Sequence, residues 1–256
     1  MEEGLVRAKE AARQALELDD SLAEADASLA WVLFIYDWDW EGAEREFRQS
    51  IALDPRYAPA RQWYSMHLAA MGRHEQSIIE AHAALELDPV SVSVRRSVAW
   101  AYYYARHYES ARQYLSRAIT MNPSAEETFR LLGLVLGQLG QWSECAKVLR
   151  QALQLSGNGP YYRATLGWAL ANSGDRAGAE AILAALTRES QSSYVSPVGF
   201  ATIHLGLGNR EPALAYTEKA LVERRGWLAY LKTNPILDQL RPEPGFKTLL
   251  ERMKLS

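Results

Sequence analysis

Residues 53–55 read Leu-Asp-Pro, the same three residues return at 87–89, and Pro123 follows after a further 34 positions. Each proline comes after a run in which apolar residues recur at helical spacing. Proline ends one helix and is favoured in the first turn of the next. A fixed period of this length is typical of a repeat architecture, in which stacked copies of one small unit share a continuous core.

Glycines keep the same 34-residue period where the prolines stop, at Gly72, Gly140, Gly174 and Gly208, and Arg106 fills the one missing slot. Glycine supplies the left-handed residue that ends a helix. The period therefore predicts units of two helices joined at these positions. They begin near residues 23, 58, 92, 126, 160 and 194, and the first has one extra residue, in the turn 36–40.

Small residues occupy two positions in every unit. The first helix carries Ala30, Ser65, Ala99, Gly133, Gly167 and Ala201, and the second carries Ala43, Ser77, Ala111, Cys145, Ala179 and Ala213. A later small position holds Ser50, Ala84, Ala118, Ala152 and Ala220, with Leu186 as the departure. Small side chains let helix backbones approach closely, so we interpret Cys145 as a packing residue because free cysteine behaves as a small hydrophobe.

The period and the small positions resemble the tetratricopeptide repeat over roughly residues 5 to 223. The resemblance implies an all-α, right-handed α-solenoid superhelix of helical hairpins with a C-terminal helical cap. We expect a half repeat at 1–22, six repeats over 23–225, and a cap over 226–256 that covers the sixth repeat. Because the half repeat lacks its first helix, we expect more protein upstream of Met1.

A narrower resemblance is to the C-terminal repeat region of bacterial multidomain signalling proteins, which carry a winged-helix, Ser/Thr kinase or adenylate cyclase domain at the N-terminus. The matching stretches are 15–25, 36–40, 194–197 and 227–232. No such output domain is present among these residues, so the activity of those domains does not carry over.

Composition excludes several functions. The 28 basic and 31 acidic residues give a net charge of −3, which argues against a nucleic-acid clamp. One cysteine excludes a disulfide framework, and the five histidines are not spaced as metal ligands. No nucleophile elbow, phosphate-binding loop or dinucleotide fingerprint occurs, so we expect neither an enzyme nor a cofactor. No signal peptide or membrane segment is visible, and a cytoplasmic location is favoured over an extracytoplasmic domain of an anchored parent.

The resemblance also implies a concave groove lined by the first helix of each repeat, at repeat positions 2, 5, 9, 12 and 13. These predicted groove residues are rich in the types that dominate protein interfaces, and Arg96 and Arg130 could hold a carboxylate. The full predicted set is Trp31, Phe34, Gln62, Met66, Arg96, Trp100, Tyr103, Tyr104, Arg130, Leu134, Tyr161, Trp168 and Asn172. The alternative is that the position 9 side chains only pack.

The leading hypothesis is a non-catalytic scaffold or sensory module that binds a protein or peptide, without contact to nucleic acid or membrane. The family's carboxylate clamp is not matched, because Trp, Met or Leu stands at its Asn position. One alternative is a small-molecule sensor with a pocket of Trp100, Tyr103, Tyr104 and Trp168. Another is a spacer, or a homo-oligomer formed through the open half repeat. Trp38 and Trp40 are left open between packing in the turn and a second contact patch.

Overall fold

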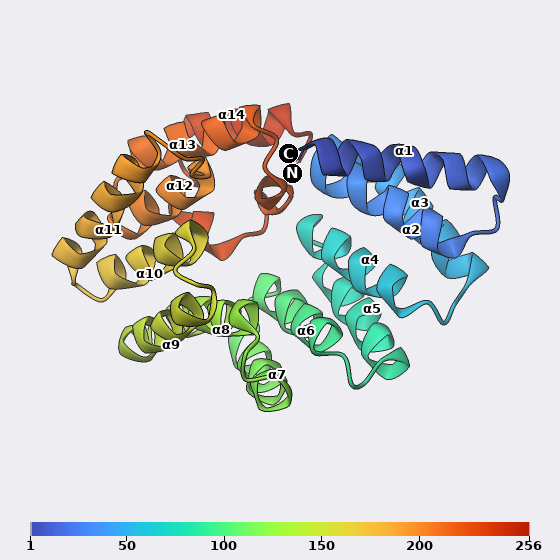
Figure 1. Cartoon of the computed structure of the whole chain (residues 1–256), viewed down its shortest axis with the longest axis horizontal. Helices are drawn as coiled ribbons and strands as arrows, with labels where there is room; N and C mark the ends of the chain where they lie inside the picture. Colours follow the sequence, from blue (N-terminus) through green and yellow to red (C-terminus); the bar gives the residue numbers. More distant parts are fainter. Residues whose placement is uncertain (1, 256) are drawn as a thin grey trace. The chain divides into compact units, whose positions relative to one another are not determined.

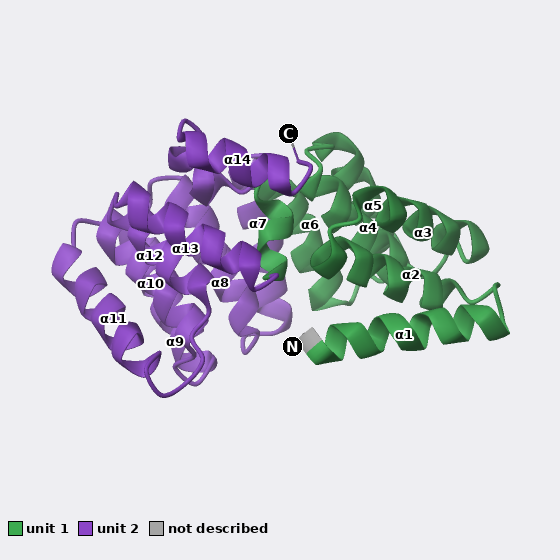
Figure 2. Cartoon of the chain, turned by 90° about the horizontal axis from the view of Figure 1, so that it is seen from above, with its two compact units in different colours: residues 1–105, 225–233 green, residues 106–224, 234–256 purple. Residues whose placement is uncertain are grey.

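The computed structural model describes residues 2–255, and the elements it contains in that range are all helices (Figure 1). The chain divides into two compact units, shown in different colours in Figure 2. Unit 1 comprises residues 1–105 and 225–233, and unit 2 comprises residues 106–224 and 234–256. Met1, with which the predicted half repeat begins, lies outside the described residues.

Unit 1 is a series of helical hairpins in which α2 packs on α3 and α4 packs on α5. Its elements are α1 (Glu2–Leu18), α2 (Ala23–Val32), the π-helical η1 (Leu33–Asp37), α3 (Trp40–Leu53), α4 (Ala58–Ala70), α5 (His74–Leu87), α6 (Val92–Tyr104) and the 3-10 helix η2 (Gly226–Tyr230). The helix α1 packs on α2 with Ala12 buried, while Leu18 at its end is 89% exposed.

Unit 2 continues the pattern, with α8 packed on α9, α10 on α11 and α12 on α13. Its elements are α7 (Tyr108–Met121), α8 (Glu126–Gln138), α9 (Trp142–Leu155), α10 (Pro160–Asn172), α11 (Arg176–Glu189), α12 (Pro197–Gly206), α13 (Arg210–Val222), the 3-10 helix η3 (Pro235–Leu240) and α14 (Pro244–Arg252). Helices and turns thus alternate as the 34-residue period predicts.

The periodic glycines have the predicted left-handed backbone, with φ between 73° and 94° at Gly72, Gly140, Gly174 and Gly208. Arg106, which takes the same slot between α6 and α7, also has a positive φ of 64°. A residue with a Cβ is strained in this region of the backbone map. The period therefore dictates the turn geometry even where its preferred residue is missing.

The small residues lie where the two helices of each hairpin cross, and they are buried in every repeat. In repeat two the Ser77 hydroxyl donates to the Ser65 carbonyl at 2.7 Å. In repeat four the Cys145 thiol donates to the Gly133 carbonyl at 3.1 Å. Burial raises the pKa of Cys145 to about 12, so its thiol stays protonated and serves packing.

The extra residue of the first repeat is taken up by η1, a π-helical turn. Its hydrogen bond runs from the Trp38 N–H to the Leu33 carbonyl, five residues back, so the turn holds one residue more than an α-helical turn. Trp38 ends it in the left-handed conformation, and the Asp39 side chain caps α3 by accepting from the Gly42 N–H at 3.0 Å. Trp40 contacts the Phe34 ring edge-on, with centroids 6.2 Å apart. This contact favours packing as the role of Trp40.

The C-terminal residues corrected our expectation of a single cap over the sixth repeat. Residues 225–233 belong to unit 1, where η2 packs on η1 and α4. Only the following part, η3 and α14, packs on α12 and α13 of the sixth repeat. The sequence shows that the 34-residue period has stopped, but it does not show where the aperiodic chain returns.

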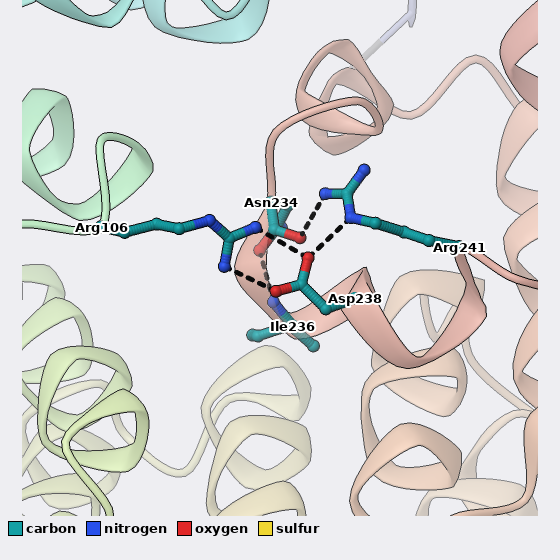
Figure 3. A network of polar contacts seen from close by, with 5 residues as sticks. All are labelled: Arg106, Asn234, Ile236, Asp238 and Arg241. Atoms are coloured by element: carbon teal, nitrogen blue, oxygen red, sulfur yellow. Dashed lines mark hydrogen bonds and ion pairs between the residues drawn. The ribbon is translucent and has the colours of Figure 1, made fainter.

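A polar network attaches η3 to the turn before α7, within unit 2 (Figure 3). The Arg106 guanidinium donates to both carboxylate oxygens of Asp238, at 2.6 and 2.8 Å, and Arg241 Nε donates to the same group at 2.7 Å. Burial alone would raise the pKa of Asp238, but the two arginines outweigh it and hold that pKa below its ordinary value. Arg106 therefore tethers the turn before α7 to η3.

Candidate functional site

Six aromatic rings of unit 1 form a continuous series from α4 through α2, η1 and η2 to α6. In order they are Trp63, Trp31, Phe34, Tyr230, Tyr104 and Trp100, with successive centroids 4.7 to 5.8 Å apart. Five of these rings come from the repeats, and four of the five belong to the predicted groove. Tyr230 comes from the C-terminal segment and joins the Phe34 ring of η1 to the rings of α6.

Tyr230 lies directly on the predicted groove residues. Its ring stacks on Tyr104 with an interplanar angle of 1° and a centroid distance of 4.7 Å, and it meets Phe34 edge-on at 5.8 Å. Leu228, Ala229 and Leu231 beside it are fully buried. The chain's own segment 225–233 therefore covers the part of unit 1 that the sequence predicts as an open groove.

The burial of apolar side chains stabilises this cover. Burying a Leu or an aromatic side chain contributes about 1.5 to 3 kcal/mol, and Leu228, Tyr230 and Leu231 are all buried. A peptide that displaced this segment would have to offset the loss of these contacts. We conclude that Phe34, Tyr103 and Tyr104, predicted as groove residues, are core residues: none is more than 4% exposed.

The remaining predicted residues of unit 1 are partly exposed, and they define what we call the A-helix face of unit 1. They are Trp31 on α2, Gln62 and Met66 on α4, and Arg96 and Trp100 on α6. Gln62 Nε2 donates to the hydroxyls of Ser93 and Ser97, at 3.0 and 2.9 Å, which ties α4 to α6 on this side.

Arg96 differs from its surroundings because its guanidinium makes no hydrogen bond or ion pair with any described residue. It lies one helical turn before Trp100 on α6, so the two side chains share a helix face. Met66 follows Gln62 at the same spacing on α4. The A-helix face thus combines an unpaired cation with partly exposed aromatic and thioether groups.

Arg130 of unit 2, the second predicted carboxylate ligand, is already paired. It donates from Nε and Nη2 to the two carboxylate oxygens of Glu127, at 2.8 and 2.6 Å, and its guanidinium lies 4.5 Å from the Tyr161 ring centre. Arg130 is only 5% exposed. The prediction that the Arg130 guanidinium binds a ligand carboxylate is therefore wrong, because its Nε and Nη2 donors are already bonded to the Glu127 carboxylate.

The other predicted residues of unit 2 also fall short of a groove. Trp168 is 3% exposed and packs edge-on against Trp142, and Leu134 is 3% exposed. Asn172 is exposed but donates to the Trp168 carbonyl at 2.8 Å, and Tyr161 is 39% exposed over Arg130. The predicted small-molecule pocket fails for the same reason: Tyr103, Tyr104 and Trp168 are buried, which leaves Trp100 alone partly exposed.

His67 is a polar residue that the sequence does not mark as unusual. It is fully buried between Phe34, Phe47 and Tyr64, and neither ring nitrogen has a hydrogen-bond partner among the described residues. Burial lowers its pKa to about 4, with a smaller contribution from Arg73. His67 is therefore a neutral core residue near pH 7.

Residues 2–255 contain neither a cluster of His, Cys, Asp or Glu that could hold a metal ion nor a helix long and apolar enough to cross a membrane. No protein-family model matches the chain, and no curated protein matches it. Similarity is found among solved structures instead.

The structure of pilF from Pseudomonas aeruginosa is similar over 83% of this chain and 96% of its own, with 20% identity and a TM-score of 0.57. PilW, described as a type IV pilus biogenesis factor, is 19% identical over 74% of this chain and 87% of its own, with a TM-score of 0.63. A chain of the APC/C hetero-tetramer Cut9–Hcn1 is 16% identical over 94% of this chain and 44% of its own, with a TM-score of 0.65. These are tetratricopeptide-repeat proteins, and this chain has their fold of repeated helical hairpins.

Proposed function

We propose that this chain is a non-catalytic interaction module that binds a peptide segment of a protein partner on the A-helix face of unit 1. The observation that carries the proposal is the unpaired Arg96 guanidinium beside the partly exposed Met66 and Trp100. The fold supports it in general terms, since stacked helical hairpins present extended binding surfaces.

The side chains on this face specify the chemistry of the peptide. A free guanidinium can hold a carboxylate through two parallel hydrogen bonds, which gives both energy and orientation. Trp31, Met66 and Trp100 offer aromatic and thioether surface, the kind that anchors apolar side chains at interfaces. The peptide therefore carries an Asp or Glu close to an aromatic or aliphatic anchor.

The setting we propose is a sensory or scaffold region of a larger bacterial signalling protein. The resemblance of residues 15–25, 36–40, 194–197 and 227–232 to the repeat regions of such proteins supports it. Partner binding would then be the input, and an output domain elsewhere in the parent chain would respond to it.

The test is a peptide array that varies one acidic and one apolar position, read against wild type and the Ser93→Glu variant. Ser93 precedes Arg96 by three residues, as Glu127 precedes Arg130. The new carboxylate can therefore pair with Arg96 as Glu127 pairs with Arg130. We expect wild type to select acidic peptides and Ser93→Glu to lose that selection while it stays folded.

The double variant Trp100→Ala with Arg96→Ala should lose binding altogether, whereas Arg95→Ala should retain it. Arg95 lies on the same helix but donates to the Pro89 carbonyl instead. Unchanged peptide selection in a folded Arg96→Ala, Trp100→Ala double variant would overturn the assignment of this face.

A further inference from the structure

A cavity of about 420 Å³ lies on another part of unit 1, between α3, α4 and α5. Its lining includes aliphatic side chains, two guanidinium groups, one carboxylate and two neutral polar side chains. They are Ile51, Leu68 and Ile79, Arg48 and Arg73, Glu80, and Tyr64 and Gln76. Leu68 is 1% exposed and forms buried floor, while Ile79 is 64% exposed although it sits in the middle of α5. Because burial of apolar surface is favourable, an isoleucine this exposed beside a cavity indicates a surface that a ligand could cover with a gain in binding free energy.

The polar end of the cavity carries an excess of positive charge. Arg48 and Arg73 both bond the same oxygen of Glu44, at 2.7 and 2.6 Å, and the Tyr64 hydroxyl donates to it at 3.0 Å. Although burial alone would raise it, the pKa of Glu44 is held below its ordinary value by Arg73 and Tyr64, so Glu44 is an anion. Two guanidinium groups therefore share the Glu44 carboxylate. The other carboxylate of the lining, Glu80, is paired with Arg61 at 2.7 Å, so one net positive charge remains.

Both arginines keep unused donors. Arg48 uses Nε and Nη2, toward Tyr64 and Glu44, and Arg73 uses Nε and Nη1, toward Gln76 and Glu44. Arg48 Nη1 and Arg73 Nη2 have no acceptor among the described residues. An anion placed here would find donors available without breaking the bonds to Glu44.

We propose that this cavity binds a small amphiphilic carboxylate, with its aliphatic chain on Ile51, Leu68 and Ile79 and its head group at Arg48 and Arg73. The volume falls in the range of small-ligand sites, about 300 to 1,000 Å³, which combine an apolar lining with few polar groups. This site shares no residue with the A-helix face of unit 1, so it does not depend on the proposed function.

The experiment is isothermal titration of the full chain with hexanoate, octanoate and decanoate, and with 1-octanol as the neutral analogue. Each pair of added methylenes should tighten the Kd roughly tenfold while the chain still fits the cavity. Octanoate should bind at one site per chain and more tightly than octanol. No heat with octanoate or decanoate, or equal affinity for octanoate and octanol, would overturn the proposal.

Paired variants locate the site. Ile79→Asn should weaken octanoate at least fivefold, and Val90→Asn should leave it unchanged, because Val90 is an exposed apolar residue of the same unit outside the cavity lining. Arg48→Met should weaken octanoate and leave octanol unchanged, whereas Arg45→Met, an exposed neighbour on α3 bonded to Glu46, should alter neither. Equal affinity in all four variants would mean general adsorption and would contradict the site.

A peptide arm separates a free ligand from a protein segment of the same chemistry. The probe is acetyl-Leu-Glu-Leu-Asp-amide, which carries aliphatic and carboxylate groups on a backbone. We expect it to bind more weakly than octanoate because its backbone polar groups would be desolvated. Tighter binding of the peptide than of octanoate, lost in Ile79→Asn, would overturn the choice of a small ligand.

Discussion

Arg96 in unit 1 and Arg130 in unit 2 occupy the same repeat position, 34 residues apart, and so do Trp100 and Trp168, 68 residues apart. In unit 1 both side chains are partly exposed and Arg96 is unpaired. In unit 2 the arginine is ion-paired and both side chains are buried. The repeat position therefore determines where a residue lies on its helix, while the neighbouring residues determine whether its side chain is exposed to solvent.

Those neighbours can be read from the alignment of the repeats. Three residues before the arginine stands Ser93 in unit 1 and Glu127 in unit 2, and only the carboxylate can close the ion pair. Counting back 31 residues from the tryptophan gives Ala69 in unit 1 and Gly137 in unit 2. A Cβ on Gly137 would lie 2.3 Å from Trp168 Cη2, so Trp168 is buried because Gly137 makes room for it.

Of the changes that separate the two units, removal of the Tyr230 ring should have the largest effect on stability. It uncovers aromatic side chains of unit 1 and leaves the contacts of unit 2 intact. Tyr230→Ala deletes the ring between Phe34 and Tyr104, and we expect a loss of about 3 to 5 kcal/mol in the free energy of unfolding. Urea denaturation and hydrogen exchange would measure it. Exchange should accelerate in α2, α4 and α6 and stay slow in α8 to α12.

Tyr230→Phe is the matched control. The Tyr230 hydroxyl is buried and has no hydrogen-bond partner among the described residues. Removing an unsatisfied hydroxyl relieves a desolvation cost, so this variant should be as stable as wild type or more stable by up to about 1 kcal/mol. A loss as large as that of Tyr230→Ala would contradict the role assigned to the ring.

The second effect is a pH dependence of stability that arises in unit 1, from His67. His67 stands at a repeat position that holds Val135, Ala169 and Ile203 in unit 2. Its pKa is about 4 in the folded chain and 6.5 in the reference state, so between these values the unfolded chain binds more protons. Stability is then complete above pH 6.5 and falls by at most about 3 kcal/mol as pH drops to 4.

His67→Leu should remove this acid loss, measured as unfolding free energy at pH 4.5 and 7. A second group acts in the opposite sense: burial, with a smaller contribution from Glu46, raises the pKa of Asp26 to about 6, so Asp26 stabilises the fold as pH falls through 6. The His67→Leu variant should therefore become more stable on acidification, and Asp26→Asn should remove that gain. If wild type and His67→Leu gave parallel pH profiles, His67 would not be the titrating group.

Local rules predicted most of the fold, and the aperiodic segment accounts for what they missed. The turns at Gly72 and Gly140 and the buried small residues follow from contacts between residues less than one repeat apart, which the sequence records directly. The return of residues 225–233 to unit 1 rests on Tyr230 meeting Phe34 and Tyr104, contacts that span more than 120 positions. No periodic signal encodes such a pairing.

The candidate site was predicted less well for a related reason. The repeat position identified the candidate binding residues on the first helix of each repeat. Whether each of these side chains is exposed depends on another residue that packs against it. The sequence does show Glu127 at the helical spacing that lets it pair with Arg130. It also shows Gly137, whose missing side chain leaves space for Trp168. The cover over Phe34 and Tyr104 was not readable, because Tyr230 lies outside the repeats.

The third effect tests the burial of Trp168. Gly137→Ala places a methyl where Trp168 packs, and forcing extra volume into a filled core costs about 1 to 3 kcal/mol. Tryptophan emission should shift to longer wavelength as Trp168 moves toward solvent, as Trp100 already is in unit 1. Gly4→Ala is the control: its new Cβ meets nothing within 4 Å, so stability should stay equal or rise slightly. An unshifted spectrum in Gly137→Ala would contradict the account of why Trp168 is buried.

The smallest effect concerns Arg106, which takes the turn position that glycine holds in repeats two, four, five and six. Its ion pair with Asp238 is about half exposed, so we expect it to contribute no more than about 1 kcal/mol. Its positive φ costs about as much, roughly 1 kcal/mol, which glycine would not incur.

Arg106→Gly should therefore change the unfolding free energy by less than about 0.5 kcal/mol, because the lost ion pair and the relieved strain offset each other. Arg106→Ala keeps the strain and loses the pair, so it should be less stable than Arg106→Gly by about 1 kcal/mol. Salt separates the two terms: wild type should lose its advantage over Arg106→Ala in 1 M NaCl, where surface pairs are screened, while the difference between Gly and Ala should persist. A glycine variant that matched alanine at both salt concentrations would show that the left-handed turn carries no strain at Arg106.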